Sequence, residues 1–340
     1  MTAAGLLAEV VRGGLVESEH HGHLVVLDAG GDVRLSIGDP GVTVWPRSSL
    51  KPLQAVAMLR SGLDLVEAEL ALACASHSGT PEHLAVVLRI LVAAGLGEED
   101  LQNTPDLPLD PAAALAWQAA GRSACSLTQN CSGKHAAMLA TCVAAGWDRS
   151  TYRSPDHPLQ RAVVATVEDL TGVRVEHVTV DGCGSMLPST TVHGLARAVG
   201  RIAAAPRSAP GSYESRVALA MAGHPVLVGG PGRDVSRFMQ GVPGLVAKDG
   251  AEGVYAAGLP DGSAVALKIA DGSARPRAAV LAAALEVLLD GHTDLVEAVR
   301  RVGCTPVLGH GRPVGEVRAT LGRPVGEVPA RRGRSPEDER

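Results

Sequence analysis

The sequence predicts an α+β fold, in which the terminal segments form one antiparallel sheet and the middle of the chain inserts a helical region. Apolar and polar residues alternate over residues 6–45, and strand-like patterning returns over 244–269. Between these stretches, from roughly 48–223, many apolar residues follow helical spacing. We therefore expect a single domain over residues 1–318, with a sheet to which both ends of the chain contribute strands.

The N-terminal part begins with a predicted hairpin. Apolar residues at 24–27 and 33–37 lie on either side of Gly30 and Gly31, as is typical of two strands joined by a tight turn. From Ser48 the spacing becomes helical, and Pro52 is compatible with a helix because it falls in the first turn.

The remaining elements follow from spacing and turn residues. A Pro/Asp-rich loop is expected over residues 103–111, a short strand over 175–180, and one final strand over 305–318. Further helices are expected at 64–74, 81–95, 112–121, 134–145, 159–170 and 212–222, with two more within 278–301.

Composition excludes several classes of protein. The chain of 340 residues is 46% hydrophobic, has a formal net charge of -5, and shows no basic stripe with interleaved aromatic residues. Nucleic acids and anionic membranes are therefore not expected as partners. The N-terminus lacks the pattern of a signal peptide, no apolar run is long enough to cross a membrane, and the 6 cysteines do not resemble a disulfide framework. We expect a cytoplasmic, reduced setting.

One short segment is duplicated near the C-terminus. Residues 311–317 (GRPVGEV) recur as residues 322–328. A single duplication is too short for a repeat architecture. We expect the first copy to belong to the final strand, and the charged tail over 319–340 to be disordered.

The first candidate for chemistry is Ser48 with Lys51. A serine and a lysine three residues apart at the start of a helix share one face, and a neutral lysine amine can accept the serine proton. The free N–H groups of the helix N-terminus also favour an oxyanion. The alternative is a capping serine with a solvated lysine, which this segment alone favours.

Three other polar segments are candidates, and two of them have an ordinary structural alternative. Residues 76–80 (SHSGT) form either a hydroxyl-bearing turn at a pocket or a plain capping turn. Residues 130–135 (NCSGKH) open an apolar helix but lack the first glycine and final Ser/Thr of a phosphate loop. Residues 181–184 (DGCG) end a strand with either a ligand contact or a buried cysteine. Lys268, in an apolar strand, faces solvent by default.

Taken together and in this order, the segments resemble the L-asparaginase II family, the thermolabile rhizobial type. The resemblance spans about residues 6–318. The matching stretches are Arg47–Ala55, Ser76–Gly79, Asn130–His135, His157–Ala162, Asp181–Gly184, Lys248–Val254, Ala266–Lys268, and Pro306–Leu308 with Val314–Glu316.

The resemblance implies a fold related to serine β-lactamases and glutaminases, a homodimer, and L-asparagine as substrate. It implies two serine–lysine pairs at one site, Ser48 with Lys51 and Ser78 with Lys268. It also implies a zinc ion that positions the substrate. The residues it assigns to that zinc are Cys131, Lys134 and Cys183, and those it assigns to the substrate are Arg47, His135 and Asp181.

The mechanism expected from these assignments is hydrolysis of an amide through an ester with the enzyme. Ser48 attacks the side-chain amide of asparagine, neutral Lys51 takes the proton, and Ser78 with Lys268 relays a proton to ammonia. Activity should rise towards alkaline pH. The alternatives are a glutaminase, another hydrolase of small amides or lactams, and a non-catalytic protein that binds amino acids. The companion motifs of lactam-directed enzymes are absent from the sequence.

Overall fold

The computed structural model describes residues 3–321, and both ends of that stretch lie in one antiparallel sheet. The strands follow the order β11-β12-β1-β2-β10-β9-β8, and β3 pairs with β2 beyond the end of β1. The strands of this sheet are β1 Gly5–Arg12, β2 Leu15–Leu27, β3 Val33–Ile37, β8 Val246–Gly250, β9 Val254–Gly258, β10 Ala264–Ile269, β11 Thr305–Gly309 and β12 Arg312–Ala319.

The middle of the chain is mainly helical, as the sequence predicts. Its two small sheets pair β4 Thr43–Val44 with β7 Thr190–Thr191, and β5 Val178–Val180 with β6 Met186–Pro188. The helices are η1 Arg47–Leu50, α1 Lys51–Arg60, α2 Glu67–Ala73, α3 Pro81–Ala93, η2 Glu98–Asp100, α4 Pro111–Ala119, α5 Ser132–Ala145, α6 Pro158–Thr171, α7 Val192–Ser208, α8 Tyr213–Gly223, α9 Pro225–Val228 and α10 Asp234–Gly241, followed by α11 Arg277–Leu288 and α12 Thr293–Gly303 after the sheet resumes.

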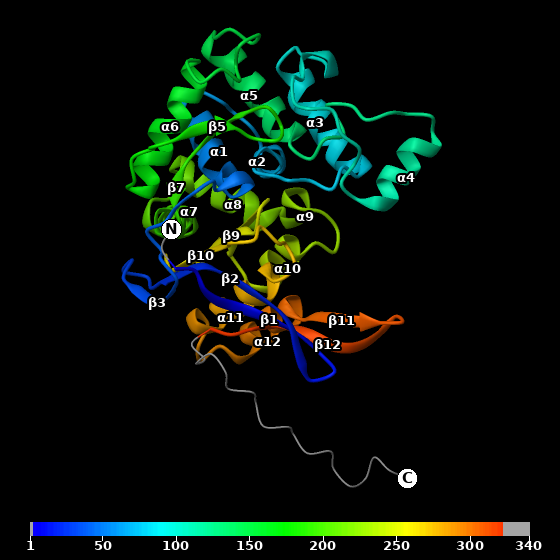
Figure 1. Ribbon diagram of the computed structural model, residues 1–340. Helices are drawn as coiled ribbons and strands as arrows, with labels where there is room; N and C mark the ends of the chain where they lie inside the picture. Colours follow the sequence, from blue (N-terminus) through cyan, green and yellow to red (C-terminus); the bar gives the residue numbers. More distant parts are fainter. Residues whose placement is uncertain (1–2, 322–340) are drawn as a thin grey trace.

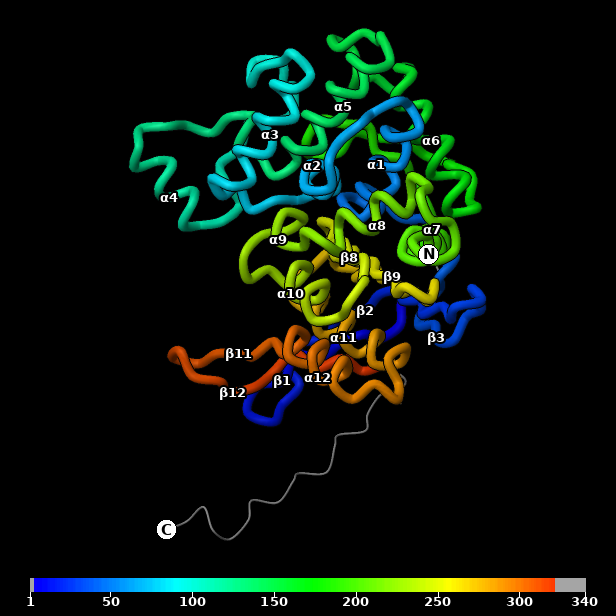
Figure 2. The backbone as a smooth tube through the Cα atoms, turned by 180° about the vertical axis from the view of Figure 1, so that it is seen from behind, coloured from blue at the N-terminus to red at the C-terminus, as the bar shows by residue number. Residues whose placement is uncertain are grey.

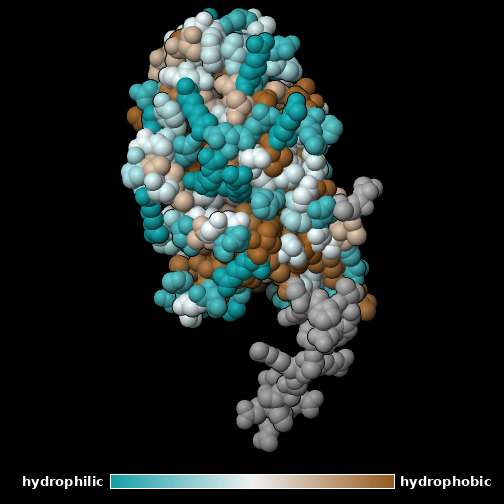
Figure 3. Space-filling model, turned by 90° about the vertical axis from the view of Figure 1, so that its left-hand side faces the viewer, coloured by the Kyte–Doolittle hydropathy of each residue, from teal (hydrophilic) through white to brown (hydrophobic). Residues whose placement is uncertain are grey.

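These elements form layers (Figure 1). Helix α7 packs on one face of the sheet, against β2, β9 and β10, while α11 packs on the other face and α12 packs on α11. The helices α1 to α6 form the upper part of the molecule, and α4 projects from its side in both views (Figure 2). On the face that carries α6 and β3, hydrophilic residues cover most of the helical part, and hydrophobic residues gather lower down (Figure 3).

Burial follows the strand and helix patterns. Strands β8 and β9 are buried along their whole length because helices and loops cover both faces of the sheet there. Leu24 to Leu27 of β2 are likewise buried on both faces. The core is therefore continuous from the sheet into the helices of the middle segment. Within residues 3–321, no helix combines the length and apolar character needed to cross a membrane.

Three sequence expectations need correction. The final segment is not one strand but the hairpin β11–β12, which turns at His310 and Gly311 because both have positive φ (47° and 75°). Helix α7 was not expected. Its two glycines and Pro206 reduce its apparent helix propensity, but Gly200 permits close approach, since a Cβ there would lie 2.5 Å from the Gly262 carbonyl oxygen. The tail expected to be disordered from residue 319 does not begin there, because Ala319 ends β12 and the Thr320 N–H donates to the Leu7 carbonyl. The second copy of the duplicated segment and the rest of the tail, residues 322–340, lie outside the described residues.

Candidate active site

The predicted site residues meet where the helical part joins the edge of the sheet. Helix η1 lies against the edge strand β8, and the Ser49 hydroxyl donates to the Lys248 carbonyl at 3.0 Å. The N-terminus of α5 reaches the same region because Gly133 allows a close crossing with α2. A Cβ at Gly133 would lie 2.7 Å from both Cγ and the carbonyl oxygen of Leu72. Glycine is therefore required where α5 begins.

Lys51 is buried and has a serine partner, but the partner is Ser76. The amine Nζ lies 3.1 Å from Ser76 Oγ, donates to the Ala75 carbonyl, and also lies 3.1 Å from Cys131 Sγ. A buried amine needs such polar partners because desolvation of a charged group is unfavourable. The Ser76 hydroxyl is correspondingly well placed to exchange a proton with Lys51.

Ser48 lies near the start of the same helical segment as Lys51, but only their backbones are joined by a hydrogen bond. It is half-buried in η1, and its carbonyl accepts the Lys51 backbone N–H. Both residues are described, and no hydrogen bond joins the Ser48 hydroxyl to the Lys51 amine. The spacing in the sequence placed both residues at the start of one helical segment. The Lys51 amine, however, extends to the turn over residues 74–80.

The second predicted pair, Ser78 with Lys268, is not formed in the structure. The buried Ser78 packs against Gly230, where a Cβ would lie 1.9 Å from Ser78 Oγ. The Lys268 amine instead donates to the carbonyls of Glu252 (2.6 Å) and Ile269 (2.7 Å). Lys268 is thus bonded to backbone oxygens near the β8–β9 turn, and the pairing we expected is corrected.

Lys248, which the sequence analysis quoted but did not assign, is the second lysine at this site. Its amine is buried and donates to Asp249 Oδ1 at 2.6 Å. Burial is the main cause that lowers the pKa of Lys248 to about 8; Asp249 opposes the shift, and nearby Lys51 adds to it. A lysine with a pKa in this range is neutral in part at mildly alkaline pH and can act as a base or acid.

Asp249 lies at the centre of a buried cluster of cations. Its Oδ2 accepts from Arg233 Nη2 at 2.7 Å and lies 3.9 Å from Arg277 Nη2. Burial opposes ionisation of Asp249, but the Coulomb attraction of Lys248 and the two arginines outweighs it, so the pKa of Asp249 lies well below its usual value. Arg233 also donates to the Ser76 carbonyl. One carboxylate therefore connects Lys248 to the segment that carries Ser76.

The residues assigned to zinc do come together. The amine of Lys134 lies 3.2 Å from Cys183 Sγ, and the Cys131 and Cys183 thiols lie close enough that each shifts the pKa of the other. The hydrogen bond from Cys131, together with Lys134, lowers the pKa of Cys183 to about 4. Two sulfur ligands, one of them a thiolate, and an amine suit zinc in donor type. Residues 3–321 contain no group of three or more His, Cys, Asp or Glu side chains that could hold a metal.

Arg47 lies between two carboxylates at this site. Its Nε donates to Asp181 Oδ1 at 2.6 Å, and its Nη1 lies 3.9 Å from Glu252 Oε1. Arg47 and Glu252 both have positive φ, 52° and 56°. A left-handed conformation costs about 1–2 kcal/mol for a residue with a side chain. Such strain is characteristic of functional sites.

His135 is close to the metal-ligand set, but its ring is enclosed. Its Nδ1 lies 2.6 Å from Tyr152 Oη, and its Nε2 is buried without a partner. Burial is the main cause of a pKa well below the usual value for His135, and nearby Lys134 adds to it. The neutral ring is therefore buried against Tyr152, and its predicted contact with substrate stays a prediction.

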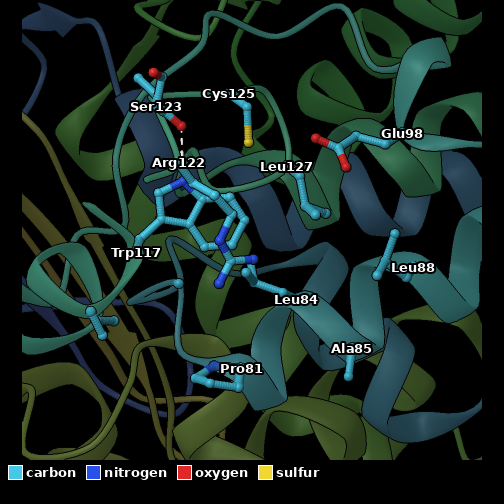
Figure 4. A pocket seen from close by; sticks show the side chains of 14 residues that line it. Pro81, Leu84, Ala85, Leu88, Glu98, Trp117, Arg122, Ser123, Cys125 and Leu127 are labelled. Atoms are coloured by element: carbon cyan, nitrogen blue, oxygen red, sulfur yellow. Dashed lines mark hydrogen bonds between the residues drawn. The ribbon is translucent and has the colours of Figure 1, made fainter. Parts of the chain in front are cut away.

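A separate groove lies between α3 and α4 and contains none of the predicted site residues (Figure 4). Its volume is about 840 Å³, and apolar side chains such as Leu84, Leu88 and Leu127 line it. The Arg122 guanidinium carbon lies 3.6 Å from the centre of the Trp117 ring. The groove adjoins Gly79, and its lining residues include no serine–lysine pair.

Comparison with known proteins identifies a family. The model of the L-asparaginase II family matches residues 8–319. No curated protein matches the sequence. Among solved structures, a "putative beta-lactamase" from Bacteroides dorei DSM 17855 is 15% identical, with a TM-score of 0.41, over 73% of this chain and 85% of that one. Mglu in its native form is 16% identical, with a TM-score of 0.38, over 80% of this chain and 66% of that one.

Proposed function

The chain belongs to the L-asparaginase II family, and we propose that it hydrolyses L-asparagine to L-aspartate and ammonia through a serine nucleophile. The observation that carries the proposal is the contact at 3.1 Å between the Ser76 hydroxyl and the buried amine of Lys51, a residue three positions after Ser48. A serine activated by a lysine can attack an amide carbon without a separate histidine.

We assign the attack to Ser48 because its half-buried hydroxyl is more open than that of Ser76, which is buried against Lys51. Ser48 Oγ forms a bond to the side-chain amide carbon of asparagine. Its proton passes to neutral Lys51, with Ser76 as the hydroxyl between them. The carbon–nitrogen bond then breaks, and the nitrogen leaves as ammonia after it receives a proton. Water hydrolyses the resulting ester to aspartate and restores Ser48.

Lys248 replaces Lys268 as the second lysine in this scheme. Its lowered pKa and its position near Lys51 suit it to give the proton to the leaving nitrogen and to take one from the water that follows. Asp249 and Arg233 hold it beside the Ser76 segment. The role that we expected for Lys268 passes to a residue that is more deeply buried and closer to Lys51.

We also propose that Cys131, Lys134 and Cys183 hold a zinc ion. When bound, the ion would supply a positive charge that orients the substrate. The contact of Lys51 with Cys131 Sγ at 3.1 Å places this set directly beside the proposed base. Lys134 must lose its proton to bind a metal. Burial favours that loss, but the two cysteines and Asp181 outweigh burial and raise the pKa of Lys134.

The direct test is ammonia release from L-asparagine, with L-glutamine and a chromogenic lactam as the competing substrates. Hydroxylamine should trap the ester as an aspartyl hydroxamate. Ser48→Ala should abolish both ammonia and hydroxamate, while Ser76→Ala should slow both. Hydroxamate formation by Ser48→Ala but not by Ser76→Ala would move the nucleophile to Ser76. Faster hydrolysis of glutamine or lactam than of asparagine would reject the substrate assignment, and binding of asparagine without any turnover would favour a binding protein.

Two further expectations stay proposals. We propose a homodimer, and the support is that no residue of α4 is buried within the chain, although its sequence is almost wholly apolar. We also propose a cytoplasmic setting, which the free state of all six cysteines supports.

A further inference from the structure

Two strained residues from different parts of the chain face each other at the proposed active site. Among residues 3–321, only Arg47, Glu252 and His310 have positive φ without being glycine, and His310 is at a hairpin turn. Arg47 Nη1 and Glu252 Oε1 are 3.9 Å apart. An ion pair with so exposed a partner contributes little to stability, less than two left-handed residues cost. The ion pair alone therefore does not explain this geometry, and strain of this kind points to function.

The surrounding structure fixes Glu252 in place. It lies in the turn between β8 and β9, and Lys268 from β10 donates to its carbonyl at 2.6 Å. The next residue, Gly253, has a φ of 70° and packs on Ile269. The other carboxylate oxygen, Oε2, lies over Gly272, where a Cβ would be 2.5 Å away. Lys268 and the two glycines thus hold the turn so that Oε1 is on the side of Arg47.

The two carboxylates beside Arg47 differ in what they can still bind. The Asp181 side chain is 11% exposed, and its Oδ1 accepts from Arg47 Nε at 2.6 Å and from the Gly182 N–H at 2.9 Å. The Glu252 side chain is 65% exposed, and its nearest cation is Arg47 at 3.9 Å. Asp181 is therefore occupied in holding Arg47, whereas the Glu252 carboxylate is exposed to solvent beside Arg47, the residue that precedes Ser48.

We propose that Glu252 binds the α-ammonium group of the substrate, while Arg47 binds the α-carboxylate. The assignment rests on the proposed function for the identity of the substrate. An α-amino acid presents a carboxylate and an ammonium group on one carbon, and a cation beside a free carboxylate matches that pair of charges. The site would thus select free α-amino acids against amides that lack the α-amino group.

The kinetic test compares L-asparagine with succinamic acid, which has the same amide and carboxylate but hydrogen in place of the ammonium group. Glu252→Gln should lower kcat/KM for asparagine by about 10- to 100-fold, mainly through KM, as expected for a hydrogen bond to a charged group. It should leave succinamic acid within about twofold, which is the scatter of neutral surface substitutions. Glu297→Gln is the matched control, because Glu297 is also exposed (69%) and faces an arginine, Arg301, at 3.8 Å.

Glu252→Gly separates charge from strain. Glycine adopts the left-handed conformation freely, so this variant relieves the strain but removes the carboxylate. It should lose selectivity for asparagine as Glu252→Gln does. If it keeps the selectivity, or if Glu252→Gln reduces both substrates equally or neither, Glu252 only shapes the turn and the proposal is wrong.

Binding of the product makes the proposal testable without turnover. Calorimetry should show that Glu252→Gln weakens binding of L-aspartate but not of succinate, which lacks the ammonium group. This result would support the subsite even if asparagine were not hydrolysed, in which case the proposed function alone would fail. Equal affinity of the wild-type protein for both compounds, or no binding of either, would overturn the subsite.

Discussion

The amine of Lys51 lies 3.1 Å from the hydroxyl of Ser76, a residue 25 positions further along the chain. Local spacing instead pointed to Ser48, one helical turn before Lys51. The difference arises because α1 begins at Lys51 and directs its long side chain towards the turn after α2, where the Ala75 carbonyl also accepts from the amine. A contact of this kind depends on the packing of α1 against α2 and α5.

The first prediction compares the two serines of the 76–78 segment. Ser76→Ala should reduce kcat by about 10²- to 10⁴-fold, the usual effect of removing a group that transfers protons. Ser78→Ala should have a much smaller effect, because Ser78 Oγ packs against Gly230 and has no lysine partner. Steady-state kinetics on asparagine would measure both. A larger loss in Ser78→Ala than in Ser76→Ala would restore the original pairing.

The second prediction compares the two lysines. Lys248→Met should lower kcat by orders of magnitude, because it removes the buried amine near Lys51 to which we assign proton transfer. Lys268→Met should act mainly on KM for asparagine, by about 10-fold, since it releases the Glu252 carbonyl and loosens the turn beside Arg47. Equal losses of kcat in the two variants would contradict this division of roles.

The third prediction concerns pH. Burial and nearby Lys51 lower the pKa of Lys248 to about 8, and the neutral amine exists above that pKa. Neutral Lys248 is needed in the second step, where it takes a proton from the attacking water, so if hydrolysis of the ester limits turnover, kcat should rise with pH and level off above about 8. A flat profile from about pH 6 to about pH 9 would contradict a lysine base.

Asp249 provides a way to move that profile. Its carboxylate favours the protonated form of Lys248, so Asp249→Asn should lower the pKa of Lys248 and shift the rise in kcat to lower pH. Arg233 and Arg277 also face this carboxylate and would then lack this negative partner. The variant will be less stable, because it leaves buried cations unpaired. The measurement is therefore the pH at which kcat rises, not the size of the rise. If kcat of the variant rises at the same pH as in the wild type, or at a higher pH, the proposed effect of Asp249 on Lys248 is wrong.

The sequence predicted the architecture better than the site. The alternation of apolar and polar residues in strands, and the helical spacing of apolar residues, depend only on which side of a single segment is buried. The terminal strands and most helices could therefore be placed from the sequence. Of the residues named from the motifs, Arg47 contacts Asp181, and Cys131 contacts Cys183, two residues further along the same loop. The pairing of Lys51 with Ser76 could not be predicted, because both Ser76 and Ser78 fit the motif and only packing distinguishes them.

The choice between the two lysines failed for a similar reason. Lys248 was quoted only as part of a matching stretch, whereas Lys268 was expected to face solvent by default and received its role from the family resemblance alone. In the structure β8 is covered on both faces and by η1 at its edge, so Lys248 is the fully buried one. Edge strands covered by a distant segment leave no periodic signal in the sequence.

The fourth prediction concerns zinc. Purified protein should contain about one zinc per chain, and Cys131→Ser or Cys183→Ser should remove most of it, because hydroxyl groups are poor zinc ligands compared with thiolates. Cys142→Ser is a control, since Cys142 is also buried and free but belongs to the middle of α5. Metal analysis by mass spectrometry would decide. Protein purified without chelators that contains no zinc and binds none on titration would contradict the assignment.

The fifth prediction concerns the exposed helix α4. A helix of nine residues is marginal alone in water, and none of its side chains is buried within the chain. A second copy of the chain that covers α4 and the adjoining groove would account for the apolar surface, including Leu115, which is 69% exposed.

Leu115→Lys should therefore convert the dimer to a monomer, because the charge would be buried at the contact without a partner. Leu219→Lys is the matched control, because Leu219 is also exposed (50%) but lies on α8. Sedimentation velocity at micromolar concentration would measure both. Wild-type protein that sediments as a monomer would exclude the homodimer, and a Leu115→Lys variant that stays dimeric would place the contact elsewhere.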